Sequence, residues 1–125
     1  MSTTAGQKTI FSKILVAIDG SDASMDAAVY AISISKQYNA EFLYALHVIR
    51  ADVDLFELHD TSEYTIEMRN KGEKYLGKVR LKANEKNIQV KTEIISSTNI
   101  AGGIVDFAEE NNINLIVIGT RGLRF

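Results

Sequence analysis

Two short glycine-containing loops stand out, because each follows an apolar stretch of the kind that forms a buried strand. Residues 19–22 (DGSD) follow the apolar residues 14–18, and residues 119–122 (GTRG) follow the apolar residues 115–118. Glycine lets backbone N–H groups come close to an anion, since no Cβ atom stands in the way. The two loops are therefore candidate parts of an anion-binding site.

Three side chains near these loops have a chemistry that can be stated. Arg121 can pair with a phosphate, and Asp19 can accept hydrogen bonds from sugar hydroxyls or help to hold a metal. Val48 ends another apolar stretch and can offer an apolar wall to a flat base. Each loop alone also fits a simple turn, and residues 19–22 fit a turn followed by a helix cap. The hypothesis of a site depends on whether the fold brings the loops together.

The apolar stretches alternate with helical patterns along the chain. Strands are expected at residues 14–18, 42–49, 88–96 and 115–118, and helices at 22–38, 63–85 and 100–111. Ser21 or Asp22 can cap the first helix. The expected core-facing stripe of this helix consists of Met25, Ala28, Val29 and Ile32.

The alternation of strands and helices predicts an α/β fold with an open parallel sheet. The third strand alternates apolar and polar residues, which is typical of an edge strand, so the simplest strand order is 3-2-1-4. In such a doubly wound sheet the winding direction reverses between strands 1 and 4, and ligands bind at the carboxyl ends of the strands there. This topology would place both glycine loops at one crevice.

The bulk properties fit one globular domain. The chain has 125 residues, a formal net charge of −2 and no Cys, which excludes disulfides and thiolate metal sites. We expect residues 1–11 to be a flexible leader and residues 12–125 to be the domain. No stretch resembles a signal peptide or a membrane span, so a cytoplasmic location without membrane association is expected.

Three segments together resemble the universal stress protein family. They are residues 13–21 (KILVAIDGS), 46–49 (LHVI) and 106–122 (DFAEENNINLIVIGTRG), and the resemblance extends over roughly residues 12–122. It implies a doubly wound fold, similar to the adenine nucleotide alpha hydrolases, with a fifth strand. It also implies ATP, with Mg²⁺ or Mn²⁺, over the ends of strands 1 and 4.

The family pattern continues after the first glycine pair with nine residues and then Gly followed by Ser or Thr. Gly119 and Gly122 match the first half, whereas the second half would fall after Phe125. The fifth strand, through which family dimers commonly form, is then expected to be missing, and strand 4 to be an open edge. The nucleotide contacts implied by the resemblance are Ala17, Ile18, Asp19, Val48, Ile118, Gly119, Arg121 and Gly122.

The first functional hypothesis is an ATP-binding module for stress response or signalling, acting as a homodimer. No residue stands out as a general base, so slow ATP hydrolysis is the most that we expect. The alternative is a dimeric regulatory protein of the same family that binds no nucleotide. A phosphorylated receiver-like domain would need an Asp at the end of the third strand, where the chain has Ser96 and Ser97.

One segment of the chain is strongly basic. Residues 69–91 hold eight Lys or Arg against two Glu, and four lysines share one face of the expected helix: Lys71, Lys74, Lys78 and Lys82. A solvated face is the simpler interpretation. The alternative is a docking surface on helix residues 69–86 for an acidic protein partner. Nucleic acid is not expected, because no aromatic residues are interleaved on that face. His47 is expected to be a core histidine, and no metal site is expected.

Overall fold

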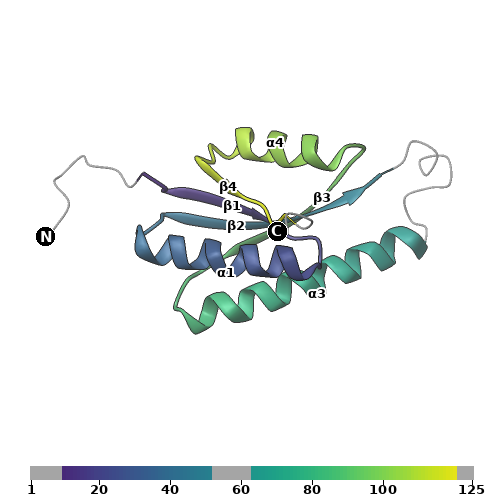
Figure 1. The fold of residues 1–125 in the computed structure, drawn as a ribbon. Coiled ribbons are helices and arrows are strands. Elements are labelled where there is room, and N and C mark those ends of the chain that lie inside the picture. The colour runs from purple at the N-terminus through teal and green to yellow at the C-terminus, as the bar shows by residue number, and fades with distance from the viewer. Residues whose placement is uncertain (1–9, 52–62, 121–125) are drawn as a thin grey trace, which may run out of the picture.

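The computed structural model describes residues 10–51 and 63–120, which form one parallel sheet and the helices that cover it (Figure 1). The strands are β1 (Lys13–Ala17), β2 (Phe42–Arg50), β3 (Lys91–Ser97) and β4 (Leu115–Val117). The helices are α1 (Asp22–Gln37), α3 (Glu63–Glu85) and α4 (Ile100–Glu110). The strand order is β3-β2-β1-β4, which confirms the order predicted from the sequence.

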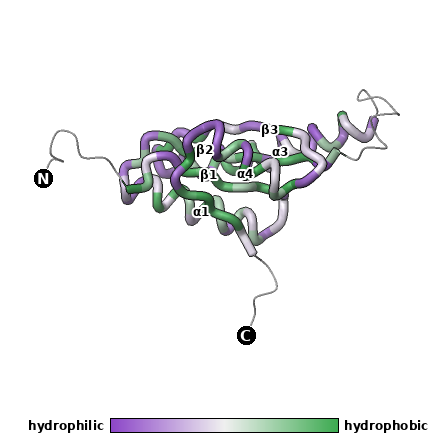
Figure 2. Tube along the Cα trace, turned by 90° about the horizontal axis from the view of Figure 1, so that it is seen from above, coloured by the Kyte–Doolittle hydropathy of each residue, from purple (hydrophilic) through white to green (hydrophobic). Residues whose placement is uncertain are grey.

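The sheet is covered on both faces, with α1 and α3 on one side and α4 on the other (Figure 1). The middle of β1 is fully buried, because Val16 pairs with Ala45 of β2 and Val117 of β4 while helices cover both faces. Figure 2 shows hydrophobic residues along β1 and also along the part of the tube that leads to the C-terminal end. Continuous apolar strands of this kind need shielding on both faces, which explains why the segments read as uninterrupted hydrophobic runs.

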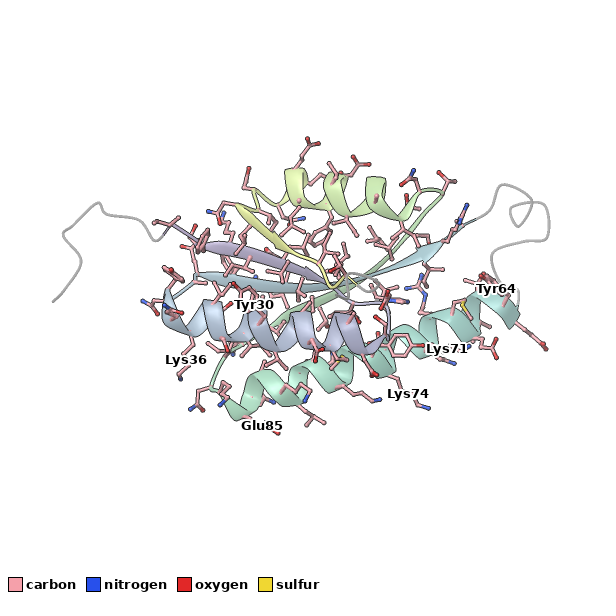
Figure 3. The ribbon with its side chains drawn as sticks, in the orientation of Figure 1. Tyr30, Lys36, Tyr64, Lys71, Lys74 and Glu85 are labelled. Atoms are coloured by element: carbon pink, nitrogen blue, oxygen red, sulfur yellow. The ribbon has the colours of Figure 1, made fainter. Side chains whose placement is uncertain are left out.

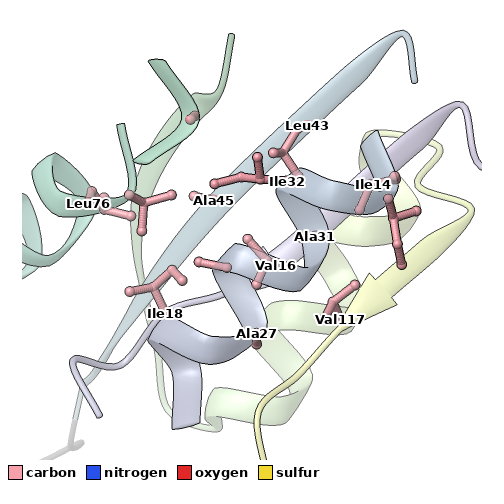
Figure 4. Close-up of a cluster of buried hydrophobic side chains, with 14 residues drawn as sticks. Ile14, Val16, Ile18, Ala27, Ala31, Ile32, Leu43, Ala45, Leu76 and Val117 are labelled. Atoms are coloured by element: carbon pink, nitrogen blue, oxygen red, sulfur yellow. The ribbon is translucent and has the colours of Figure 1, made fainter. Parts of the chain in front are cut away.

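The larger part of the core lies between the sheet and the helices α1 and α3 (Figure 4). The inner face of α1 there is lined by Ala27, Ala28 and Ala31, all at most 7% exposed. The prediction that Val29 faces the core is wrong, since its side chain is 47% exposed. Residue 29 lies roughly 100° around the helix from residue 28, so with the alanines against the sheet Val29 falls on the flank.

Six strand boundaries differ from the sequence-based expectation, five of them by one residue and the start of β3 by three. β3 begins at Lys91 rather than at residue 88, because its pairing with β2 starts where Lys91 meets Tyr44. Ile88 and Val90 still pack against the core, although they precede the ladder. β1 ends at Ala17 and β4 at Val117, one residue earlier than expected. Each is followed by an isoleucine, and Ile18 is buried whereas Ile118 is 55% exposed.

The long helix α3 contains two glycines with different surroundings. A Cβ atom on Gly72 would lie 2.5 Å from Cδ2 of His47, so this glycine gives the histidine ring room on β2. A Cβ atom on Gly77 would meet only Arg80 Nη2, at an ordinary 3.7 Å. Gly72 is therefore needed for packing, whereas the structure gives no such reason for Gly77.

We expect opposite results from the same substitution at these two positions. Gly77→Ala should raise the free energy of unfolding by about 0.5–1 kcal/mol, because alanine is the better helix former and the space is open. Gly72→Ala should lower it, because the displaced histidine ring outweighs the same gain in helix propensity. Urea denaturation of both variants checks this, and an equal stabilisation by both would contradict it.

Candidate functional site

A pocket of about 180 Å³ opens at the carboxyl ends of the strands, where the winding of the sheet reverses between β1 and β4. Its lining comes from the end of β1, the β2 strand, the start of α4 and the residues after β4. The lining residues are Ala17, Ile18, Asp19, Ser24, Leu46, Val48, Ile100, Ile104, Ile118 and Gly119. The two expected loops therefore meet at one hollow, as the predicted topology requires.

The loop after β1 is held by local hydrogen bonds. The Ser21 N–H donates to Asp19 Oδ1 (2.9 Å), and the Ser24 N–H donates to Ser21 Oγ (3.1 Å), which makes Ser21 the N-cap of α1. The buried Ser24 hydroxyl donates to the Ser21 carbonyl (2.9 Å) and accepts from the Asp19 N–H (3.3 Å). These contacts fix the positions of Asp19 and of the first turn of α1 relative to each other.

Gly119, after β4, lies directly against the first turn of α1. A Cβ atom at this position would lie 2.2 Å from the Ala23 carbonyl oxygen and 2.9 Å from the Ser24 nitrogen. Both atoms belong to the backbone, so no side-chain movement could make room. Glycine is thus required here for the close approach of the two backbones that form one wall of the pocket.

The chemistry of the pocket is that of a binding site with apolar walls. Side chains of Leu46, Val48, Ile104 and other aliphatic residues make the walls, and the polar part consists of Asp19, Ser24 and backbone groups. The N-termini of α1 and α4 lie at this edge, where the positive end of a helix dipole favours an anion. A volume of about 180 Å³ is below the roughly 300 Å³ of a complete small-molecule site, so it suits one apolar portion of a ligand.

Six of the eight residues expected from the sequence line this pocket, and they come from three separate segments: 17–19, 48 and 118–119. The other two, Arg121 and Gly122, lie outside the described residues. The pocket is also lined by four residues that were not expected from the sequence: Ser24, Leu46, Ile100 and Ile104. Ser24 and Ile100 could have been found, since the first turns of helices that follow strands lie at the same edge of the sheet.

The other singled-out residues lie away from the pocket or outside the described part. His47 is half-buried, and its ring Nδ1 donates to the Ile18 carbonyl (2.7 Å), in agreement with a core histidine. The four lysines on one face of α3 are all exposed, and Lys74 extends away from the sheet (Figure 3). The second histidine of the chain, His59, lies outside the described residues.

Residues 10–51 and 63–120 contain no cluster of three or more His, Asp or Glu side chains arranged to hold a metal ion. None of their helices combines the length and apolar character needed to cross a membrane.

The fold and the position of the pocket define an open, doubly wound α/β protein, and comparison with known proteins gives the family. Residues 11–125 match the universal stress protein family, and the chain belongs to it. It is 36% identical to universal stress protein MJ0531 of Methanocaldococcus jannaschii over 119 residues, covering 92% of this chain and 68% of that protein. It is 38% identical to universal stress protein YxiE of Bacillus subtilis over 123 residues, covering 91% and 82%.

Solved structures show the same fold at lower sequence identity. A universal stress protein from Burkholderia pseudomallei superposes with a TM-score of 0.78 at 23% identity, covering 91% of this chain and 85% of that one. One from Archaeoglobus fulgidus in complex with dAMP gives 0.69 at 21%, covering 90% and 83%. A universal stress protein in complex with cAMP gives 0.63 at 19%, covering 90% and 74%. Some members of the family therefore bind nucleotides.

The contact of Gly119 with α1 gives a direct test of how the pocket wall is built. Gly119→Ala should lower the free energy of unfolding by about 1–3 kcal/mol, because two backbones must move apart. Gly102→Ala is the matched control, since a Cβ atom there would meet only Asn99 side-chain atoms at 3.5 Å or more. Thermal and urea unfolding of both variants measure the difference, and equal stability of the two would show that the contact is not tight.

Proposed function

We propose that this chain is an ATP-binding module of the universal stress protein family that acts in stress response or signalling. The observation that carries the proposal is the convergence of residues 17–19, 48 and 118–119 on one pocket at the reversal of the sheet. The adenine nucleotides held by two structural relatives support this ligand class. The proposal keeps the cytoplasmic location expected from the sequence.

The parts of the nucleotide can be assigned to the parts of the pocket. The adenine ring lies against the apolar walls near Val48 and Ile104, which are buried and present no charge. Asp19 accepts hydrogen bonds from the ribose hydroxyls or helps to hold Mg²⁺ or Mn²⁺ near the phosphates. The phosphates lie near Gly119 in this proposal, and Arg121 and Gly122, which lie outside the described residues, are the further contacts that the family resemblance implies.

We propose binding without efficient catalysis. Among the described residues that line the pocket, Asp19 is the one with an ionisable side chain, and it already orders its own loop through Ser21. A general base must be within hydrogen-bond reach of an attacking water and free to take its proton. Nucleotide binding would therefore change the conformation of the protein or its interactions, with slow hydrolysis at most.

The pocket assignment predicts that filling the base wall blocks the nucleotide. Val48→Phe should weaken Mg-ATP and AMP at least tenfold, which is about 1.4 kcal/mol, because the added ring occupies the space of the adenine. Val105→Phe is the matched control, since Val105 is on α4 but 49% exposed and outside the pocket lining. Calorimetric titration of the wild type and both variants measures this.

The outcomes of that titration are distinct. Saturable binding that is lost only in Val48→Phe supports the pocket. Binding that Val48→Phe leaves unchanged places the nucleotide elsewhere. No binding of Mg-ATP or AMP to the wild type contradicts the proposal and leaves a regulatory protein of the same family that binds no nucleotide.

A second candidate function, a dimeric interaction protein, is favoured by the exposed edge of the sheet. Within the described residues β4 pairs only with β1, and Ile116 on this strand is 37% exposed. An apolar edge strand tends to recruit another strand, so a homodimer through β4 is proposed. An acidic partner at the lysine face of α3 stays a prediction from the sequence.

A single charged residue on β4 tests whether this edge forms a dimer interface. Ile116→Lys should shift the protein toward the monomer, because a lysine on an edge strand opposes strand pairing. Val29→Lys, on the exposed flank of α1, introduces the same charge away from the edge. Sedimentation velocity over a range of concentrations gives the oligomeric state. A wild-type monomer at all concentrations, or equal effects of both variants, would rule out this interface.

A further inference from the structure

We propose that His47 and Tyr75 are positioning residues that hold the loop after β1 in the geometry of the pocket. Neither residue lines the pocket: His47 is on β2 with its ring against Gly72 of α3, and Tyr75 is on α3 itself. The consequence for ligand affinity rests on the proposed function. The effect on the loop itself does not, and it can be measured without a ligand.

His47 and its neighbour Leu46 hold Ile18, the residue that directly follows β1. The Ile18 N–H donates to the Leu46 carbonyl (2.8 Å), which continues the pairing one residue past the end of the strand. The Ile18 carbonyl accepts from Nδ1 of the His47 ring at 2.7 Å. A carbonyl can only accept, so Nδ1 carries the proton in this contact. Both polar backbone atoms of Ile18 are thus held by β2, and the chain turns away from the sheet directly after them.

Tyr75 supports the next part of the loop. A Cβ atom on Gly20 would lie 2.5–2.7 Å from three carbons of the Tyr75 ring, so the ring lies directly against the Gly20 backbone. Gly20 has φ of +88°, a conformation that glycine adopts without strain. The ring therefore prevents the loop from moving toward α3 at Gly20, the residue of the loop whose backbone can adopt the widest range of conformations.

The two rings support each other. The centroids of the His47 and Tyr75 rings are 5.6 Å apart in an edge-to-face arrangement with an interplanar angle of 72°. Gly72, one turn before Tyr75 on α3, leaves the space that the imidazole occupies. The chain thus contains a continuous contact from Gly72 through His47 and Tyr75 to the loop that carries Asp19.

Strand geometry explains why these residues act on the pocket from behind it. Neighbouring side chains of a strand point to opposite faces, so Leu46 and Val48 face α4 and the pocket, while His47 faces α3. The same short stretch of β2 therefore supplies the wall of the pocket and the support for the loop at its rim. Loss of that support should displace Asp19 and Ser24 without removing any atom of the pocket.

Amide hydrogen exchange tests the loop without ligand. The reporters are the N–H groups of Asp19, Ser21 and Ser24, which are all hydrogen-bonded. We expect at least tenfold faster exchange in His47→Phe, which keeps a ring but loses the donor, and in Tyr75→Leu, which loses the ring. Tyr75→Phe should keep the wild-type protection, because it retains the three ring carbons that lie nearest to Gly20. Exchange in the centre of β1 should stay slow.

Val79→Ala controls for a general loss of stability. Val79 is fully buried on the same helix and is outside the pocket lining and the His47–Tyr75 contact. Its truncation should lower global stability and leave the three reporter amides protected. If the loop amides exchange as slowly in His47→Phe and Tyr75→Leu as in the wild type, the proposal is wrong. It is equally wrong if Val79→Ala exposes the loop to the same extent.

Titration with Mg-ATP then connects the loop to the ligand. We expect His47→Phe and Tyr75→Leu to weaken binding about tenfold, and Tyr75→Phe to recover the wild-type affinity. Faster loop exchange with unchanged affinity would contradict the role in ligand positioning. If the wild type binds no nucleotide while the loop exchange responds as described, the proposed function fails and the support of the loop by the two rings stands.

Discussion

The position of β1 between β2 and β4 is the constraint on which the other features depend. Ile14, Leu15 and Val16 have no exposed surface, because strands adjoin β1 on both sides and helices cover both faces. After the carboxyl end of a strand enclosed in this way, the chain can continue only out of the sheet, between the ends of the two neighbouring strands. The loop that follows must therefore lie at the reversal of the winding, and the pocket forms around it.

The polar features of the pocket are few and local. Hydrogen bonds between the side chains of Asp19, Ser21 and Ser24 and nearby main-chain groups order the loop after β1, and the wall near Gly119 is a contact of two backbones. Side chains contribute chiefly apolar surface. This composition supports the proposal of binding without efficient catalysis, because Asp19 is the one ionisable side chain among the described residues that line the pocket.

The fold could be predicted from the sequence because its signals are local. Uninterrupted apolar runs indicate strands buried on both faces, and the alternation along β3 indicates an edge, so the strand order followed. The exact face of α1 could not be predicted, since valine and alanine both read as apolar. The contact with the sheet selected the alanines and left Val29 on the flank. Likewise, the start of β3 depends on where β2 offers a partner, at Tyr44.

The residues of the candidate site divide in the same way. Those that directly follow strands, such as Asp19 and Gly119, could be named from the sequence and from the family resemblance. The roles of the glycines could not, because each depends on an atom distant in the sequence. From the sequence alone, Gly72 only weakens a helix, whereas in the fold it makes room for the His47 ring. Gly20 likewise suggests an ordinary turn, whereas in the fold it packs against the Tyr75 ring.

The alanine-lined inner face of α1 has a mechanical consequence. Ala27, Ala28 and Ala31 have no side-chain rotamers, so α1 cannot adjust at these three buried positions by changing side-chain conformation. The first turn of α1 touches Gly119 through backbone atoms, and a close-packed interior transmits strain. We therefore expect a displacement of the first turn of α1 to move the helix as a rigid body. A displacement that began at the pocket would then reach the C-terminal end of α1. There Lys36 Nζ donates a hydrogen bond to the Lys86 carbonyl, just after α3.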